Sequence, residues 1–398
     1  MTASTRWTTT AVALFALAVA SRTSFEAQGS GTGPGAPLRG LTAREFSEFR
    51  LGLDDFLEVE TAEDGLGPAF NGTSCAVCHN APAVGGGSSM LETRAMYREE
   101  NGEIRPLDAS GETLMHMFSI PTHGCQPLMP MTVAIVARRA PIPLFGAGLV
   151  EAIPDAALIA LSDPDDFNRD GISGRAAVVT DVATGEKRVG RFGWKSQHAT
   201  LLAFSADAYR NEMGITNDLF PRELAVGVSA AAMARCDPRP DPEDVRDRLT
   251  QRRGIDNFET FMKFLAPVER ASLTPEAREG EQVFSAIGCT GCHVPELTTG
   301  PNANPLFDRK AVALFSDLLL HDVGTGDGIP QAAALPNEIR TPALWGLRLR
   351  RPLLHDGRAA TLDDAIRSHD VEALAVRQRY ERLTESARRV LKAFLDSL

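Results

Sequence analysis

Apolar residues form one continuous run near the start of the chain and periodic patterns after it. The run covers residues 11–20, follows the single positive charge of Arg6 and ends in Ala18-Val19-Ala20. A short apolar stretch behind a cationic start and ahead of an A-x-A site is typical of a cleavable secretory signal, and it is too short to span a bilayer comfortably. We therefore expect a signal peptide over residues 1–20, cleaved after Ala20, and a periplasmic or otherwise exported protein.

Behind this signal, the apolar and polar positions predict a mainly α-helical protein with small β-hairpin insertions. Residues 21–40 include the Gly/Pro-rich stretch SGTGPGAPL, which is typical of a flexible linker. Asn101-Gly102 and Gly185 each lie between two strand-like runs and predict hairpin turns. Residues 223–235 and 243–252 are expected to be helical. No later segment approaches the length of a transmembrane helix, so the mature protein is not expected to span a membrane.

A second domain is predicted to begin shortly before SLTPEAREGEQVFSAIGCTGCH. Thr274 suits a helix N-cap with Pro275 at the first helical position, and Val283 and Ile287 share one face of that helix. Residues 383–398 have a helical pattern at the other end. We expect an N-terminal domain over residues 41–266, which carries the hairpins, and a C-terminal domain over residues 267–398.

The charge of the chain limits its partners. The formal net charge is −11, and it becomes −12 when the first 20 residues are removed, because they contain Arg6 and no acidic residue. An acidic chain without a Lys/Arg cluster is a poor nucleic-acid binder. Small molecules or a basic protein partner are the better expectation.

Four of the six cysteines form two C-x-x-C-H motifs, Cys75-Ala-Val-Cys78-His79 and Cys289-Thr-Gly-Cys292-His293. Two thiols at this spacing can each form a thioether with a haem vinyl group, and the adjacent histidine then reaches the iron. Zinc knuckles are a weaker alternative because the motifs are 214 residues apart and each contains its own histidine. A redox-active dithiol would not need the histidine. We therefore predict two covalently bound c-type haems, held through Cys75, Cys78, Cys289 and Cys292.

The other two cysteines, Cys125 and Cys236, have no such motif around them. In an oxidising compartment they could be joined in a disulfide or stay free, and the sequence does not decide between these states.

With both motifs in place, the chain resembles the exported di-haem oxidoreductases, which are related to the bacterial di-haem cytochrome c peroxidases. The stretches that carry the resemblance include GPAFNGTSCAVCH, GRFGWKSQHATLL, NEMGITNDLFP and EIRTPALWGLRLRRPLLHDGRAATLDDAI. The resemblance implies two cytochrome c-like haem domains. The N-terminal haem, with His79 as its proximal ligand, would be the peroxidatic one. The C-terminal haem, with His293, would feed it electrons.

The same resemblance suggests roles for four further residues. The second ligand of the C-terminal haem lies fourteen residues beyond the histidine of HDG, which here leads from His355 to His369, where the peroxidases usually have methionine. A bis-histidine haem should have a lower reduction potential than a His/Met one. His355 itself would support a haem propionate. Trp194 precedes Thr200-Leu201 at the family spacing and would lie between the haems. Glu212 begins the E-M-G triplet and would be the acid–base catalyst for peroxide.

The remaining histidines and methionines have open roles. His321 in LLLHDVG suits either a second supporting contact or an ordinary loop histidine, and the latter is slightly favoured. The candidates for a distal ligand of the first haem are listed together, and none is preferred: His116, His123, His198, Met90, Met96, Met115 and Met117.

Calcium has a partial signature. Asp166, Asn168 and Asp170 followed by Gly171 match the start of a calcium loop, but Ala177 stands where a bidentate acid is expected. A calcium ion and an Asx-rich turn fit equally well. The peroxidases also bind calcium through a T-x-P segment, and Arg350-Arg351-Pro352 replaces that segment here.

We expect an exported peroxidase that takes hydrogen peroxide or a related small oxidant, with a small redox protein or a quinol-linked donor as the source of electrons. Two alternatives stay open: a non-enzymatic di-haem electron carrier, and an oxygenase or protein-modifying oxidase on the same scaffold. A fixed sixth ligand at the His79 haem would favour the carrier. A broad opening there would favour the oxidase.

Overall fold

The computed structural model describes residues 33–108, 111–122, 124–237 and 239–398. The predicted signal peptide, the first part of the predicted linker and His123 lie outside these residues. The last part of that linker is fixed in place, because Leu38 N–H donates to Phe264 O (2.7 Å) and Pro37 forms an antiparallel bridge with Leu265.

The helices are α1 (Ala43–Leu57), α2 (Cys75–Cys78), α3 (Ala147–Glu151), α4 (Asp155–Leu161), α5 (Leu201–Met213), α6 (Ala230–Cys236), α7 (Gly254–Phe264), α8 (Pro275–Ala286), α9 (Leu362–Arg367), α10 (Leu374–Glu381) and α11 (Glu385–Leu395). Single 3₁₀ turns cover Cys289–Gly291, Leu347–Leu349 and Val371–Ala373. The strands are β1 (Ala69–Phe70), β2 (Glu92–Arg98), β3 (Ile104–Pro106), β4 (Leu114–Met115), β5 (Phe118–Ser119), β6 (Val133–Arg139), β7 (Val178–Thr180), β8 (Lys187–Val189), β9 (Leu297–Thr298), β10 (Ala311–Val312), β11 (Leu320–His321) and β12 (Ile339–Arg340).

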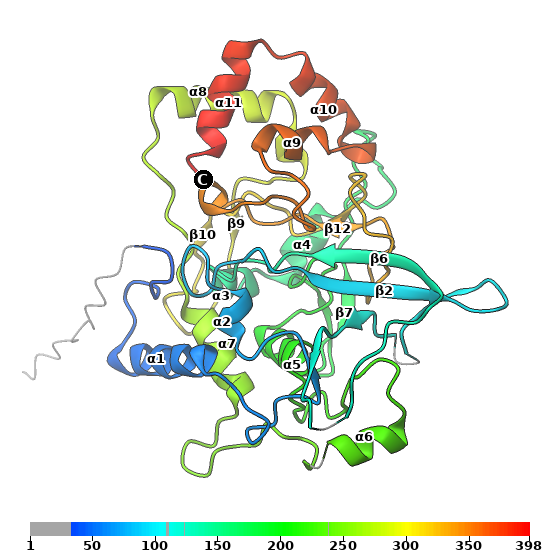
Figure 1. Ribbon diagram of the computed structural model, residues 1–398. Coiled ribbons are helices and arrows are strands. Elements are labelled where there is room, and N and C mark those ends of the chain that lie inside the picture. The colour runs from blue at the N-terminus through cyan, green and yellow to red at the C-terminus, as the bar shows by residue number, and fades with distance from the viewer. Residues whose placement is uncertain (1–32, 109–110, 123, 238) are drawn as a thin grey trace, which may run out of the picture.

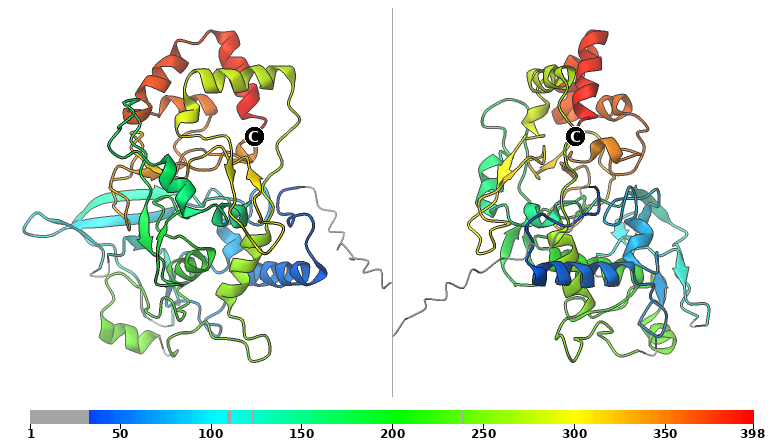
Figure 2. Two further views of the ribbon diagram at one scale, coloured as in Figure 1. Left: turned by 180° about the vertical axis from the view of Figure 1, so that it is seen from behind. Right: turned by 90° about the vertical axis from the view of Figure 1, so that its left-hand side faces the viewer.

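Two pairs of helices cross at a glycine. Gly52 of α1 lies against the backbone of α7, so close that a Cβ there would meet Asn257 O. Gly280 of α8 lies in the same way against Val390 O of α11. Only glycine allows backbones to approach so closely. In Figures 1 and 2 the α8/α11 pair lies at one end of the molecule with α9 and α10, and the α1/α7 pair lies at the other end with α5.

The strands are a larger part of the fold than small hairpins. Strand β2 pairs antiparallel with β6 along one edge and with β3 and β4 along the other. The β2/β6 ribbon extends from the body between the two helical ends (Figure 1). The hairpin turns predicted at Asn101-Gly102 and Gly185 are confirmed, since they join β2 to β3 and β7 to β8. The expectation of a mainly helical chain with small hairpins is therefore confirmed in part, because the strands form small antiparallel sheets and not hairpins alone.

The buried apolar residues form two main clusters. The larger contains Phe49, Phe56 and Phe261, but also Leu314 and Leu319, which come from beyond the predicted boundary at residue 266. The smaller is built by the C-terminal helices around Phe284 and Phe394. Part of the chain that follows the second cysteine motif therefore packs onto the N-terminal core.

Two predicted helices are wrong in whole or in part. Only Ala230–Cys236 of the first is helical, because Gly227 has a positive φ of 78° and Ser229 caps the helix. Residues 243–252 form no helix. The backbone N–H groups of Glu243 and Asp244 donate to Thr216 O and not to carbonyl groups of their own segment. The Asp244 carboxylate accepts from the first N–H groups of α7. Long-range contacts here override local propensity.

Within the described part of the chain, no helix is long and apolar enough to cross a membrane.

Candidate haem sites

The first C-x-x-C-H motif folds as a single helical turn. His79 N–H donates to Cys75 O (3.1 Å), which turns the imidazole inward. Its Nδ1 lies 2.8 Å from Gly86 O, and since a carbonyl only accepts, Nδ1 carries the proton. Burial lowers the pKa of His79. The ring is therefore neutral, with the lone pair of Nε2 free for a metal, and the carbonyl fixes its orientation.

The second motif repeats this arrangement. It follows α8 directly, and His293 N–H donates to Cys289 O (3.0 Å). Its Nδ1 lies 3.0 Å from Phe315 O, which again leaves Nε2 free. Burial, with the nearby His369 as the next cause, lowers the pKa of His293 to about 4. Each motif thus presents a neutral imidazole.

The cysteine thiols are not poised as redox thiols. Burial raises the pKa of Cys75, Cys78 and Cys289 to about 12 and also raises that of Cys292. Reactive dithiols need the opposite shift. Neutral thiols therefore fit thioether attachment of a haem better than they fit thiol–disulfide exchange.

Each motif opens into a cavity. The N-terminal cavity is lined by Cys75, Cys78, His79, Met90, Glu92, Met117, Arg139, Trp194 and Glu212, among others. The C-terminal cavity is lined by Cys289, Cys292, His293, His321, Arg350, His355, His369, Arg377 and again Trp194, among others. The structure therefore brings the predicted haem residues together in two groups, and Trp194 lines both cavities.

Both cavities contain buried cationic nitrogens without a partner. Nη2 of Arg139 faces no acceptor in the N-terminal cavity, and the same holds for Nη2 of Arg350 and Nε of Arg377 in the C-terminal one. A buried unpaired guanidinium N–H costs free energy unless an anion receives it. A haem carries two propionates, so these residues fit a haem in each cavity. Sequence reasoning missed all three arginines, which lie far from either motif.

His369 lies at the end of α9 and lines the C-terminal cavity with His293. Thr361 and Asp364 form a capping box at the start of this helix, with Thr361 Oγ1 accepting from Asp364 N–H (3.1 Å). Nδ1 of His369 lies 2.8 Å from Ala365 O, so its Nε2 is also free. The geometry supplies two imidazoles with available Nε2 atoms to one cavity.

His355 lies beside Trp194 at the boundary of the two cavities. Its ring centroid is 6.0 Å from that of Trp194, and its backbone carbonyl accepts from Ala140 N–H (2.6 Å). The Nε2 atom is buried without a partner. Burial lowers the pKa of His355 to about 4. A neutral histidine with one unused nitrogen fits a supporting contact to a group in the C-terminal cavity.

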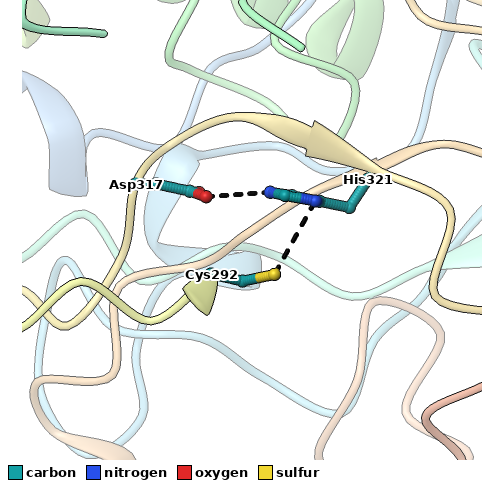
Figure 3. A group of neighbouring side chains, drawn as sticks. All are labelled: Cys292, Asp317 and His321. Atoms are coloured by element: carbon teal, nitrogen blue, oxygen red, sulfur yellow. Dashed lines mark hydrogen bonds and ion pairs between the residues drawn. The ribbon is translucent and has the colours of Figure 1, made fainter. Parts of the chain in front are cut away.

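His321 is held by two carboxylates. Its Nε2 lies 2.8 Å from Asp317 Oδ2, and Cys292 Sγ lies 3.7 Å from its Nδ1 (Figure 3). The same Nδ1 lies 2.9 Å from Glu372 Oε2. Although burial lowers it, the bonds to Asp317 and Glu372 raise the pKa of His321 to about 12. The donor atoms of Cys292, Asp317 and His321 lie within 4.8 Å of one another, but a protonated imidazole between carboxylates explains their closeness without a metal.

Trp194 is fixed on all sides. Its Nε1–H donates to Ala140 O (2.8 Å), and its carbonyl accepts from Arg340 N–H (2.8 Å). The guanidinium carbon of Arg350 lies 5.1 Å from the indole ring. A rigid aromatic group between two cavities is suited to carry electrons between them.

Glu212 enters the N-terminal cavity from the last turn of α5. This helix ends at Gly214, where a positive φ of 71° and the close carbonyls of Gly67 and Ala69 leave no room for a side chain. Glu212 Oε2 accepts from Asn71 Nδ2 (2.9 Å). Burial, followed by the charge of Glu92, raises the pKa of Glu212 to about 8. Sequence reasoning missed Glu92, which carries no motif.

The structure narrows the other ligand candidates. His116 is bound to Asn211 O and His198 to Asp207, and neither lines the N-terminal cavity. Of the four methionines, only Met90 and Met117 line it.

The predicted calcium loop is exposed, and its polar groups are used locally. The Asp166 carboxylate accepts from Gly171 N–H, and Asn168 Nδ2 donates to Asp170 Oδ2 (3.1 Å). This is the pattern of Asx turns. Calcium there stays a prediction without support from the geometry.

Cys125 and Cys236 are joined in a disulfide, which ties the chain before β6 to α6.

Comparison with known proteins finds a family and distant structural neighbours. Residues 127–398 match the family described as di-haem oxidoreductase, putative peroxidase. No curated protein matches the sequence.

Three solved structures are similar at a distance. A hydrazine synthase of Kuenenia stuttgartiensis is 16% identical, with a TM-score of 0.42, over 93% of this chain and 90% of its own. The diheme peroxidase BthA of Burkholderia thailandensis is 16% identical, with a TM-score of 0.41, over 88% and 86%. A MauG-like protein associated with microbial copper homeostasis is 17% identical, with a TM-score of 0.32, over 71% and 95%. Such values assign neither an activity nor a substrate.

Proposed function

The chain belongs to the di-haem oxidoreductase family, and on that basis we propose that it is an exported c-type peroxidase that reduces hydrogen peroxide in its N-terminal cavity with electrons received through its C-terminal cavity. One observation carries the proposal. Two cavities, each with a C-x-x-C-H motif, meet at Trp194, and the N-terminal one contains the interacting carboxyl groups of Glu92 and Glu212.

The residues that would hold the cofactors follow from the geometry. Cys75 and Cys78 would anchor one haem and Cys289 and Cys292 the other, with His79 and His293 as axial ligands. His369 would be the second ligand in the C-terminal cavity. A haem in each cavity would supply an iron that exchanges single electrons, and the iron in the N-terminal cavity would also bind peroxide.

We propose two haem domains, at residues 41–266 and 267–398, which the crossed helix pairs α1/α7 and α8/α11 support. The difference between the cavities supports a division of labour. A cavity with two available imidazoles suits electron transfer, because two strong ligands leave no position for a substrate. The N-terminal cavity contains Glu212, which can hold or move a proton at its carboxyl oxygens.

An electron carrier is the second candidate, because Met90 and Met117 line the N-terminal cavity and a thioether could close the sixth position there. Electron paramagnetic resonance of the ferric protein separates the two functions. The peroxidase requires a signal from the N-terminal haem that changes on addition of hydrogen peroxide. Two low-spin signals that peroxide leaves unchanged, in the fully oxidised and in the half-reduced protein, would refute it.

Trp194 is tested by Trp194→Phe with Trp345→Phe as the matched control, since Trp345 lines neither haem cavity. In half-reduced protein mixed with peroxide, oxidation of the C-terminal site should be at least about tenfold slower in the Trp194 variant, because the bridging indole is lost. Equal rates in both variants would remove Trp194 from the electron path.

The electron donor is proposed to be a small redox protein or a quinol-linked donor.

A further inference from the structure

Two carboxyl groups face the N-terminal cavity from elements far apart in the sequence. Glu92 is the first residue of β2, and Glu212 lies in the last turn of α5. Both line the cavity with Cys78 and His79, and their side chains are hydrogen-bonded to each other. A carboxylate has only acceptor atoms, so two carboxyl groups can form such a bond only if one of them holds a proton.

The surroundings of the two groups differ. Glu92 is bound by the guanidinium of the buried Arg94, with Nε 2.6 Å from Oε1 and Nη2 3.3 Å from Oε2. Glu212 instead accepts from the neutral amide of Asn71. The negative charge is therefore more stable on Glu92, and the proton belongs on Glu212.

The charges around the pair strengthen this asymmetry. Arg139 also lines the cavity, and its charge likewise stabilises the Glu92 carboxylate. Although burial raises it, the charge of Arg94 lowers the pKa of Glu92, whereas burial and the charge of Glu92 raise that of Glu212. Other titratable groups that line the cavity are His79, whose pKa is lowered by burial, and Asp207, whose pKa, although burial raises it, is lowered to about 2 by His198. Cys78 would be a thioether in the holoprotein and would not titrate. Beyond Arg94 lies Glu112, which shares that arginine from outside the cavity.

We propose that Glu92 and Glu212 work as a dyad with one shared proton, in which Glu212 faces the substrate and Glu92 is a positioning residue that takes or returns the proton. A solitary protonated Glu212 could not accept a proton from hydrogen peroxide. In the dyad, the Glu212 proton moves to Glu92, and the freed Glu212 oxygen accepts a proton from one peroxide oxygen.

The step balances as follows. The Glu212 oxygen returns that proton to the other peroxide oxygen, which leaves as water when the O–O bond breaks. The one-electron donor of the proposed function supplies two electrons in total, and two protons from solvent complete the second water. Overall, one hydrogen peroxide, two electrons and two protons give two waters. This use of the dyad rests on the proposed function, whereas the shared proton itself does not.

Infrared difference spectroscopy of the holoprotein against pH measures the proton directly, through the C=O stretch of a protonated carboxyl group. The wild type should have a band that disappears as the pH rises through about 8, and Glu212→Gln should lack it. In Glu92→Gln the repulsive charge is gone and Arg94 is released from its partner. The band should then disappear at a pH lower by about one unit or more.

Glu112→Gln is the matched control, because it removes a carboxylate from the same arginine outside the cavity and should leave the band unchanged. The pH at which peroxide turnover falls should move in Glu92→Gln in the same direction as the band. An unchanged band in Glu92→Gln, with native circular dichroism, would overturn the dyad. Absence of the band in the wild type would also overturn it. A band that behaves as expected in a protein inert to peroxide would instead refute the proposed function alone.

Discussion

Arg350 should protect Trp194 from oxidation. Its guanidinium carbon lies 5.1 Å from the indole ring, and its Nη2 has no protein partner to neutralise it. At an effective dielectric constant of about 20, two unit charges at this separation repel each other by about 3 kcal/mol. Loss of an electron from Trp194 would create the second charge. The arginine should therefore raise the oxidation potential of the indole by up to about 140 mV, since about 59 mV corresponds to a tenfold change for one electron, and by less where a haem propionate neutralises Arg350.

The test is Arg350→Gln, with Arg351→Gln as the control. Arg351 is the exposed neighbour, and its guanidinium binds backbone carbonyls away from the indole. Each protein is treated with excess peroxide without a reductant. The tryptophan radical is measured by electron paramagnetic resonance, and oxidation of Trp194 is measured by mass spectrometry of the digested protein.

We expect the radical and the oxidised peptide to increase in Arg350→Gln and to stay at the wild-type level in Arg351→Gln. The full electrostatic effect corresponds to roughly a hundredfold shift of the equilibrium between Trp194 and other oxidised sites. Equal oxidation in all three proteins would show that the charge of Arg350 does not control the indole. Electron transfer through Trp194 would then not depend on the charge of Arg350.

Three further predictions concern ligation and stability. His369→Ala should change the C-terminal haem from low spin to high spin, and an unchanged electron paramagnetic resonance spectrum would mean that another residue is the ligand. Although burial raises it, His198 lowers the pKa of Asp207 to about 2. The ordinary pKa of an aspartate is higher, so the wild type should be more stable than Asp207→Asn by about 2 kcal/mol at pH 5. This difference in the free energy of unfolding, measured in urea, should decline as the pH falls from about 4 to about 2. Gly280→Ala should cost about 2 kcal/mol or more in the same assay, because the new Cβ would meet Val390 O, whereas Gly33→Ala has open space and should not.

The parts of the structure that the sequence predicted depend on short-range signals. The hairpin turns at Asn101-Gly102 and Gly185 and the N-cap at Thr274 each involve residues within a few positions of one another. The two haem motifs are equally local. Backbone groups that find their partner three or four residues away leave a pattern that can be recognised without the fold.

The parts that could not be predicted depend on contacts between distant segments. Glu92 reaches Glu212 only because β2 and α5 line one cavity, and its neighbour Arg94 reaches it through the alternation of side chains in a strand. Residues 243–252 have a helical pattern, but Thr216 O binds their backbone. The unpaired arginines of the cavities belong to this class too, because it is the fold that brings them to the cavities.

A repeated pattern of glycine and phenylalanine connects the sequence, the helix crossings and the two candidate haem sites. Gly52 and Phe56 on α1, and Gly280 and Phe284 on α8, have the same spacing, and each glycine lets its helix cross a partner closely. Each phenylalanine ring then lies 6.2 Å from the motif histidine, His79 or His293. The two sites therefore share one frame, and the division of labour proposed for them would come from what each cavity adds to it. His369 adds a second imidazole to one cavity, and Glu92 and Glu212 add two interacting carboxyl groups to the other.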